Sequence, residues 1–494
     1  MVDNLSRLLQ TCNELKTFAL ALLHMKNKIF AIIAVSLACS QVMGATYYWT
    51  RGSATGSNNR YYTNINNWSL KDTYDNTTNP NGYNLEPADS IPGESDEMRL
   101  MFRSGSNGSD GTSTTPTIML SQNVDLGKMI INNTDRPPLM ISGPDNSITF
   151  NKKALNSDIK GSYTIITKER NIGTFSFDTN IIVAHSGNHR VIVQNTSDAD
   201  LAFLGKNFTA EGEMASGEYR EVRFSFSQRG KYDEWMDYAS GDIILNTGIY
   251  SKMNVVFSGG GKLNAPNHSE GVFWLKGTQS NVMGWTHITD CAKIYLDKRG
   301  GAQAITSDKG KMLYVGWRSH VVWLNDNQIA DDITVQFKTP IIDTQSPSDL
   351  TCIFDLNGHS ERIGKIDMWN DNTLAKQGLQ TIIDFGNGGE QSFTFASINF
   401  QTTNSSFQSR VNFYRTFLDF RNYRMGEDHV YCASKLSAST FMNDDPRDRT
   451  TKTYLNLLRF PEFGVFGVDY EIAETQVTIN GETLYEYSPR ALGN

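Results

Sequence analysis

The chain of 494 residues is poor in charge and in proline. Asp, Glu, Lys and Arg together make up 20% of it, and 13 prolines stand against 40 glycines. After residue 44 it holds 41 Lys and Arg residues against 51 Asp and Glu residues, with no basic tract. Duplex-binding proteins normally present clustered basic residues, so we expect no nucleic-acid partner. The low charge and the frequent Gly and Asn also argue against a helical bundle or coiled coil.

Cysteine is scarce as well. Three of the five cysteines, Cys291, Cys352 and Cys432, follow residue 44. Three cysteines in about 450 residues are no disulfide framework, so we expect buried thiols, with one bridge as the alternative. No His-Glu-x-x-His or Cys-x-x-Cys motif is present. The sequence therefore predicts no metal site and no cofactor.

Long apolar runs are missing except near the N-terminus. Lys26 and Lys28 precede an apolar run over 29–39, and Val42-Met43-Gly44 comes before Ala45. This pattern predicts a secretory signal peptide over 25–44, cleaved after Gly44. Eleven apolar residues are too few to span a bilayer. Residues 1–24 lie upstream of this signal and are interpreted as a misassigned start, and no later segment predicts a membrane span.

Short apolar or alternating segments bounded by Gly, Asn, Asp and Ser fill the rest of the chain. Each is four to ten residues long and rich in β-branched and aromatic residues, as strands are. The predicted strands are 174–183, 190–194, 201–204, 220–226, 242–245, 254–257, 272–275, 293–296, 312–315, 333–337, 352–356 and 381–385. No helix of ten or more residues is predicted after the signal, so we expect an all-β protein.

The spacing of these strands favours one β architecture over others. Strand starts at 254, 272, 293, 312, 333 and 352 are 18 to 21 residues apart. This is about twice the spacing in sandwiches and barrels and suits a solenoid that stacks one strand per turn. We predict a right-handed parallel β-helix over 115–440, with about 16 turns and a length of about 75–80 Å.

Such a coil needs covers at both ends against edge pairing. Residues 45–114 are aperiodic, polar and aromatic, which suits an N-terminal cap. Residues 441–494 contain a charged loop followed by predicted closing strands at 455–463 and 476–485 and a tail.

Several motifs resemble a known family. Tyr48-Trp49-Thr50-Arg51-Gly52, Asn66-Asn67-Trp68 and Ile91-Pro92-Gly93-Glu94-Ser95-Asp96 resemble the opening of exported bacterial β-solenoid proteins with autotransporter-associated β-strand repeats. The stretch 353–396, with Asp355-Leu356-Asn357-Gly358, resembles the recurrent turns of that family most specifically.

The resemblance implies a passenger-like protein of a Gram-negative bacterium, with a structural, adhesion or recognition role. Members often end in a translocator barrel, and no such segment is identified up to Asn494. The expected location is outside the inner membrane, extracellular or at the cell surface, with the periplasm as the alternative. The expected partner is an extracellular glycan or a cell-surface component.

An enzyme is the competing hypothesis. Asp326, Asp331, Asp332 and His359 invite comparison with polysaccharide-degrading enzymes, the pectin hydrolases and lyases, which are built on the same coil. Inverting hydrolysis needs two carboxyl groups about 6.5–9.5 Å apart, one of them protonated. The Asn357-Gly358 turn, which favours positive φ, already accounts for the Gly-His pair. The sequence therefore assigns no catalytic residue.

Aromatic residues are the candidate ligand platforms. Trp274, Trp317 and Trp323 recur along the predicted coil, and indole rings bind the apolar faces of sugars. Aromatic side chains in solenoid strands also commonly pack inside the coil. We therefore expect a non-enzymatic protein in which these tryptophans are either glycan platforms or core residues.

Overall fold

The structure is a computed structural model of the whole chain. It describes residues 45–49, 61–70, 88–102, 117–133, 139–150, 162–169, 174–184, 190–211, 221–226, 241–259, 271–308, 310–316, 318–338, 351–369, 380–401, 417–442 and 451–493. The predicted signal peptide and the upstream segment lie outside these residues, as does Trp317.

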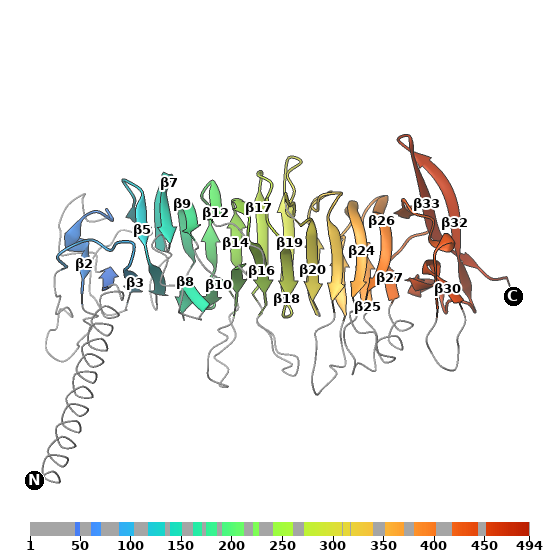
Figure 1. The fold of residues 1–494 in the computed structure, drawn as a ribbon, viewed down its shortest axis with the longest axis horizontal. Coiled ribbons are helices and arrows are strands. Elements are labelled where there is room, and N and C mark those ends of the chain that lie inside the picture. The colour runs from blue at the N-terminus through green and yellow to red at the C-terminus, as the bar shows by residue number, and fades with distance from the viewer. Residues whose placement is uncertain are drawn as a thin grey trace, which may run out of the picture.

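The described chain is nearly all β, as predicted, and is dominated by two long sheets that run along an elongated body (Figure 1). Sheet A has 16 strands, in the spatial order β2 (Trp68–Ser69), β1 (Thr46–Trp49), β3 (Glu97–Phe102), β6 (Lys128–Asn133), β8 (Ser162–Glu169), β10 (Arg190–Thr196), β13 (Glu221–Ser225), β16 (Asn254–Ser258), β18 (Thr286–Thr289), β20 (Met312–Gly316), β22 (Thr334–Lys338), β24 (Glu361–Trp369), β26 (Gln391–Gln401), β28 (Asp428–Cys432), β33 (Glu482–Ala491) and β32 (Tyr470–Ile479).

Sheet B has 15 strands. Its main path is β15 (Gly248–Ser251), β12 (Asn207–Glu211), β9 (Phe175–Ala184), β11 (Leu201–Phe203), β14 (Ile243–Asn246), β17 (Phe273–Gly277), β19 (Lys293–Lys298), β21 (His320–Trp323), β23 (Cys352–Asp355), β25 (Gln380–Asp384), β27 (Phe417–Arg421) and β31 (Leu458–Arg459). Off this path, β7 (Leu139–Phe150) pairs with β4 (Thr117–Met119), β5 (Val124–Leu126) and β9.

The remaining elements are small. Strands β29 (Thr440–Met442) and β30 (Thr451–Thr453) form a separate two-stranded sheet. The helices among the described residues are short 3-10 turns: η2 (Ile65–Asn67), η4 (Leu436–Ala438), η5 (Tyr454–Leu457) and η6 (Pro461–Phe463). Within the described ranges, no helix is long and apolar enough to cross a membrane.

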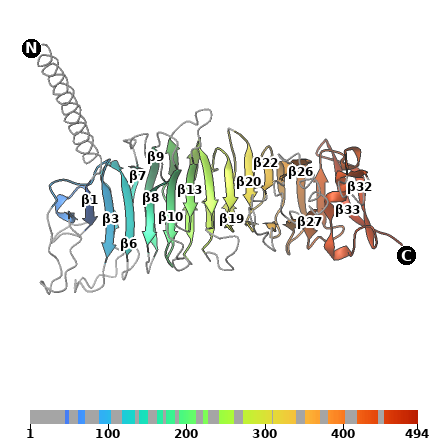
Figure 2. The ribbon, with the colours of Figure 1, turned by 60° about the horizontal axis from the view of Figure 1, so that its bottom comes forward.

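Strand pairing is parallel throughout sheet B and from β1 to β28 in sheet A, as predicted, but the repeat differs from the prediction. From β16 to β28, consecutive strands belong alternately to sheet A and sheet B. Figure 2 shows the strands of the body from a second side. Two strands that are neighbours in one sheet are therefore separated along the chain by one strand of the other sheet. Paired residues are 21 positions apart at Phe273 and Ile294, and 33 positions apart at Val321 and Phe354.

The prediction of one strand per turn every 18–21 residues, and of about 16 turns, is therefore wrong. The strands at 254 and 272, assigned to successive turns, are β16 and β17, which lie in different sheets. The predicted regular spacing mixed strands of both sheets and missed β18 and β21.

The hydrophobic core lies between the two sheets. Side chains of β9 alternate strictly between buried and half-buried, as expected for a strand with one face against a core. Rings stack along each sheet, as Phe224 and Phe257 do at 5.5 Å between centroids. Rings also meet across the sheets, as Phe337 of β22 and Phe354 of β23 do at 5.1 Å. These contacts bury apolar surface that no single strand could bury alone.

The turn after β23 has the predicted backbone. Asn357 has a φ of 49° and Gly358 a φ of 85°. The backbone N–H of Asn357 donates to Asp355 Oδ1 at 3.0 Å. A Cβ on Gly358 would approach the Gly388 Cα of the next turn at 3.1 Å, so this site favours glycine for both φ and space.

The two ends of the body are built differently. At the N-terminal end, β1 and β3 already pair in parallel, and β3 pairs in parallel with β6. Sheet A therefore begins within the segment 45–114 that we expected to be a cap. At the C-terminal end, β32 and β33 form an antiparallel hairpin, and β33 pairs antiparallel with β28.

The cysteines match the prediction of buried thiols. Cys291, Cys352 and Cys432 are all buried and form no disulfide bond. Burial raises the pKa of the Cys432 thiol to about 12.

Candidate functional site

The predicted acid–base group is divided among separate ion pairs. His359 Nδ1 lies 3.2 Å from Asp326 Oδ1, and the backbone N–H of Ser360 donates to the same oxygen at 2.9 Å. Asp326 therefore binds the turn that follows β23. The structure brings Asp326 and His359 together, and their contact holds two neighbouring turns.

Asp331 and Asp332 have other partners. Arg362 Nε lies 3.5 Å from Asp331 Oδ2, and Asp332 forms an ion pair with Lys311. Arg362 also donates two hydrogen bonds of 2.7 Å to Glu482 at the start of β33. These contacts connect β24 to the C-terminal hairpin, so the charged side chains hold parts of the fold together.

Trp323 is not an exposed platform, contrary to one of the two interpretations above. Its side chain is fully buried, and its indole N–H donates to the carboxylate of Glu361. The physical reason lies in the strand alternation, because Val321 and Trp323 of β21 both point into the core. Its ring packs against Phe354 at 4.9 Å.

Glu361 is a buried carboxyl that connects the two sheets. Besides Trp323 of sheet B, it accepts backbone N–H groups of Gln328 at 2.7 Å, Ile329 at 3.2 Å and Arg362 at 3.0 Å. Burial raises its pKa to about 8, against the lowering effect of these four donors. The group therefore titrates near neutral pH inside the protein.

Trp274 is half-buried on the outer face of sheet B, and its ring is enclosed. Tyr295 of the next strand stacks on it at 4.3 Å between centroids with 14° between the planes. Lys276 Nζ lies 4.0 Å from the same ring centroid. Two groups this close to one ring must occupy opposite faces, so a sugar could pack on this indole only if the Lys276 side chain moved away.

The edge of the Trp274 indole is held as well. Its Nε1–H donates to Asp242 Oδ2 at 2.7 Å, while Asp242 Oδ1 accepts the backbone N–H of Val272 at 2.9 Å. Burial raises the pKa of Asp242. Trp274, Tyr295, Lys276 and Asp242 thus pack against one another on the outer face of sheet B.

A different row of side chains lies on the outer face of sheet A. Its members come from five adjacent strands and are placed opposite one another by the parallel register: His287, Tyr314, Gln336, Asp367 and Asn399, here called the sheet A row. Their sequence neighbours Leu313, Val315, Val335 and Phe337 point into the core. The row therefore lies on the side of sheet A away from the core. Gln336 and Asp367 are nonetheless buried there.

Hydrogen bonds connect the C-terminal half of this row. Gln336 Nε2 donates to Asp367 Oδ2 at 3.3 Å, and Asn399 Nδ2 donates to Asp367 Oδ1 at 3.2 Å. Lys365 Nζ lies 3.4 Å from the same Asp367 oxygen. Gln336 Oε1 is buried and has no hydrogen-bond partner. This acceptor is the unsatisfied group of the row.

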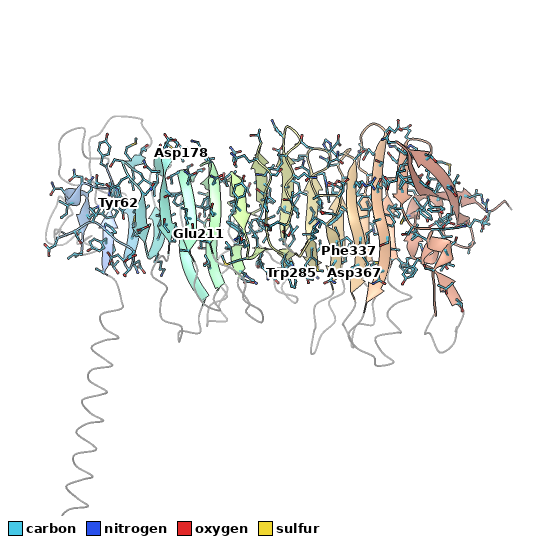
Figure 3. The ribbon with its side chains drawn as sticks, turned by 45° about the horizontal axis from the view of Figure 1, so that its top comes forward. Tyr62, Asp178, Glu211, Trp285, Phe337 and Asp367 are labelled. Atoms are coloured by element: carbon cyan, nitrogen blue, oxygen red, sulfur yellow. The ribbon has the colours of Figure 1, made fainter. Side chains whose placement is uncertain are left out.

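Aromatic rings form the N-terminal half. Tyr314 lies 4.5 Å from His287 and 5.7 Å from Trp285 between ring centroids. Burial and the charge of Asp367 both raise the pKa of Tyr314, so its hydroxyl stays protonated. Trp285 precedes β18 and is 37% exposed. Figure 3 shows Trp285 and Asp367 along the same side of the body.

This row was not predicted from the sequence. Its members are separated by 22 to 32 positions, and a repeat of 18–21 residues does not align them. A polar or tyrosine side chain on the side away from the core in each of β20, β22, β24 and β26 was the available signal. That signal becomes visible only when alternate strands are assigned to different sheets.

Among the described residues, no cluster of three or more His, Cys, Asp or Glu side chains could hold a metal ion. No family model, curated protein or solved structure matches this chain.

Proposed function

We propose that the protein is an exported, right-handed parallel β-solenoid that binds an extracellular glycan or cell-surface component and catalyses no reaction. Export is inferred from the sequence pattern at 25–44. The solenoid is inferred from parallel strands that alternate between two sheets. Crossover connections between parallel strands are right-handed in nearly all proteins, and this rule supports the proposed hand.

The sheet A row is the observation that carries the binding role. It combines a histidine, a tyrosine, two amides and a carboxylate on the side of sheet A away from the core, where Gln336 and Asp367 are buried and the partly exposed Trp285 lies beside Tyr314. Sugar sites use these side chains, since aromatic rings cover apolar sugar faces and polar groups bind hydroxyls. An extended face also allows several weak contacts to add along one polymer.

The same observations favour binding over hydrolysis. Asp326, Asp331 and Asp332 are each engaged by a different residue, His359, Arg362 and Lys311 respectively. A hydrolase needs one carboxyl group to protonate the leaving oxygen and another to activate water or act as nucleophile.

A combined binding and activity screen tests this proposal. The purified protein is applied to a glycan array and is incubated with the same polysaccharides, whose reducing ends are then counted. We expect retention on a subset of glycans without new reducing ends. Release of reducing ends would establish the enzyme instead, and uniform absence of retention would remove the glycan role.

Export is tested separately by cell fractionation. We expect the mature protein outside the inner membrane with Ala45 as its first residue, as read by N-terminal sequencing. Recovery of the uncleaved chain in the cytoplasm would contradict export.

A further inference from the structure

Strand β32 is a long edge strand at the C-terminal end of the body (Figure 1). The terminal strands β2 of sheet A and β31 of sheet B have two residues each, and β15 has four, whereas β32 has ten. Short strands, lysine, proline and β-bulges keep edge strands from pairing with other chains. β32 contains no lysine or proline, and its ladder with β33 has no register shift. Among the described residues, no strand pairs with its other side, so this edge is open.

The turn of the hairpin fixes which backbone groups face the open edge. Asn480 and Gly481 have φ values of 52° and 83°, and Ile479 pairs with Glu482 across them. A two-residue turn with positive φ at both central residues is of type I′ and closes on a hydrogen-bonded pair. Hydrogen-bonded pairs alternate along an antiparallel ladder. Odd-numbered residues of β32 therefore bond to β33, and even-numbered residues direct their N–H and C=O groups to the open edge.

Hydrogen bonds at the base of the hairpin agree with this alternation. The carbonyl of Asp469 accepts the N–H of Leu492, which follows β33, at 3.0 Å. The carbonyl of Tyr470 instead accepts the N–H of Gly467 at 2.8 Å. Beyond this base, the backbone groups at the open edge belong to Ile472, Glu474, Gln476 and Thr478.

The part of β32 nearest the turn is exposed and uncharged. Residues 475–479 are Thr, Gln, Val, Thr and Ile, and three of them are exposed. Uncharged segments rich in β-branched residues pair readily when they lie on an edge. The two carboxylates of β32 are engaged within the chain, because Glu471 accepts from Arg490 Nε at 2.8 Å and Glu474 accepts the backbone N–H of Ser437 at 3.0 Å.

A second copy of the same strand fits this edge. In an antiparallel pair with a two-fold axis at Gln476, this residue lies opposite its own counterpart, and the outward groups of even-numbered residues meet one another. Thr475 then lies opposite Val477, and Glu474 lies opposite Thr478. β-Branched side chains therefore pair and no carboxylate faces another. Such a contact uses the same surface on both copies and closes after two.

We propose that two copies of the chain pair antiparallel through the outer edge of β32, so that sheet A continues from one copy into the other. The dimer joins the two bodies at their C-terminal ends. This inference goes beyond the proposed function and does not depend on it. Because the dimer carries the sheet A row twice, it would bind a polymer or a surface at two places.

Sedimentation velocity of the purified protein over a wide range of concentrations tests the dimer. Gln476→Pro removes an outward N–H and leaves the ladder to β33 in place. Gln476→Lys and Gln476→Glu each set like charges against each other across the two-fold axis. Thr483→Lys is the matched control, because it adds a charge to an exposed residue of β33, one strand away from the edge. Far-UV circular dichroism checks that each variant keeps its strands.

We expect the wild-type chain to pass from monomer to dimer as the concentration rises. Gln476→Pro should raise the dissociation constant of the dimer at least about tenfold. Gln476→Lys and Gln476→Glu should each raise it about fivefold, and an equimolar mixture of the two should associate more tightly than either alone. Thr483→Lys should behave as the wild type.

A wild-type chain that stays monomeric at every concentration would overturn the proposal. So would a dimer that Gln476→Pro and both charge variants leave intact, because its interface would then lie elsewhere. A mixture of the Lys and Glu variants that associates no better than either alone would overturn the two-fold register at Gln476.

Discussion

The outer faces of sheets A and B carry similar residue types, but their tryptophans differ in how far neighbouring side chains cover the indole ring. Each has a tryptophan next to a tyrosine of the following strand, with an aspartate nearby. On sheet B, Trp274 is stacked on Tyr295, covered by Lys276 and held by Asp242. On sheet A, Trp285 is tilted against Tyr314 and stays partly exposed, and Gln336 keeps an unsatisfied acceptor.

The difference shows that residue type does not define a ligand platform. An indole with a side chain packed on each face stabilises the pairing of its strands, whereas an indole with an exposed face can bind a ligand. Which case applies depends on the residues that the register places on adjacent strands.

Replacing each tryptophan by alanine should separate these two roles most strongly. Trp274→Ala should lower the free energy of unfolding by about 2 kcal/mol, because a half-buried ring with a stacked neighbour is lost. Trp285→Ala should lower it by about 1 kcal/mol or less. Equilibrium denaturation by urea measures both values, and an equal cost at the two positions would contradict the comparison.

The buried carboxyl between the sheets predicts a pH dependence. The pKa of Glu361 is raised to about 8 in the folded chain and is near 4.5 in the unfolded chain. Its protonated form therefore stabilises the fold at low pH, and this contribution is lost as the pH rises from about 4.5 through about 8. The stability advantage of the wild type over Glu361→Gln should therefore fall over this range and change sign, because the loss from a pKa shift of this size exceeds the advantage at low pH.

Urea denaturation of both chains at several pH values between 5 and 9 provides the measurement. At pH 5 the variant should be less stable by about 1–3 kcal/mol, because its amide N–H group faces other N–H donors. Parallel stability curves for the two chains would show that Glu361 does not titrate in this window.

The aspartate beneath Trp274 should have a smaller effect. Asp242→Ala removes two hydrogen bonds, to Trp274 and Val272, and should cost about 1–2 kcal/mol. Asp242→Asn keeps one acceptor oxygen and should cost about half as much. Thermal denaturation ranks the two variants, and an alanine variant as stable as the asparagine variant would show that Asp242 does not hold the indole.

The smallest effect is expected at Gln336. Gln336→Met removes one hydrogen bond to Asp367 but also removes the unsatisfied oxygen, so the two effects should offset each other to within about 1 kcal/mol. Urea denaturation checks this value. A loss above about 2 kcal/mol would mean that the amide oxygen has a partner in the folded protein.

The twelve segments predicted between residues 174 and 385 all correspond to strands of the structure, but their assignment to two sheets could not be predicted. The predicted segment 174–183 corresponds to β9 (Phe175–Ala184), and 312–315 corresponds to β20 (Met312–Gly316). The strands β18 and β21 were missed, because four residues that include a histidine give little periodicity. Without them, strands of opposite sheets seemed to follow one another.

Predicting the candidate site also required knowing which strands pair with each other. Trp323 and Trp285 are the same residue type, and the local sequence does not tell them apart. Only the neighbours on adjacent strands show that Trp323 is buried in the core and that Trp285 is partly exposed. Gln336 and Asp367 are 31 positions apart and meet through strand pairing. In contrast, the positive φ of Asn357 and Gly358 was predictable, because it follows from local sequence.

Engineered disulfides test the register of the two sheets most directly. Lys293 and His320 are opposite each other on β19 and β21 of sheet B, whereas Met312 lies on β20 of sheet A. Under mild oxidation, the pair Lys293→Cys and His320→Cys should cross-link in the folded protein, as peptide mapping by mass spectrometry would show. Cross-linking of Lys293→Cys to Met312→Cys in place of that pair would mean that successive strands stack in a single sheet, contradicting the two-sheet register and the row of side chains built on it.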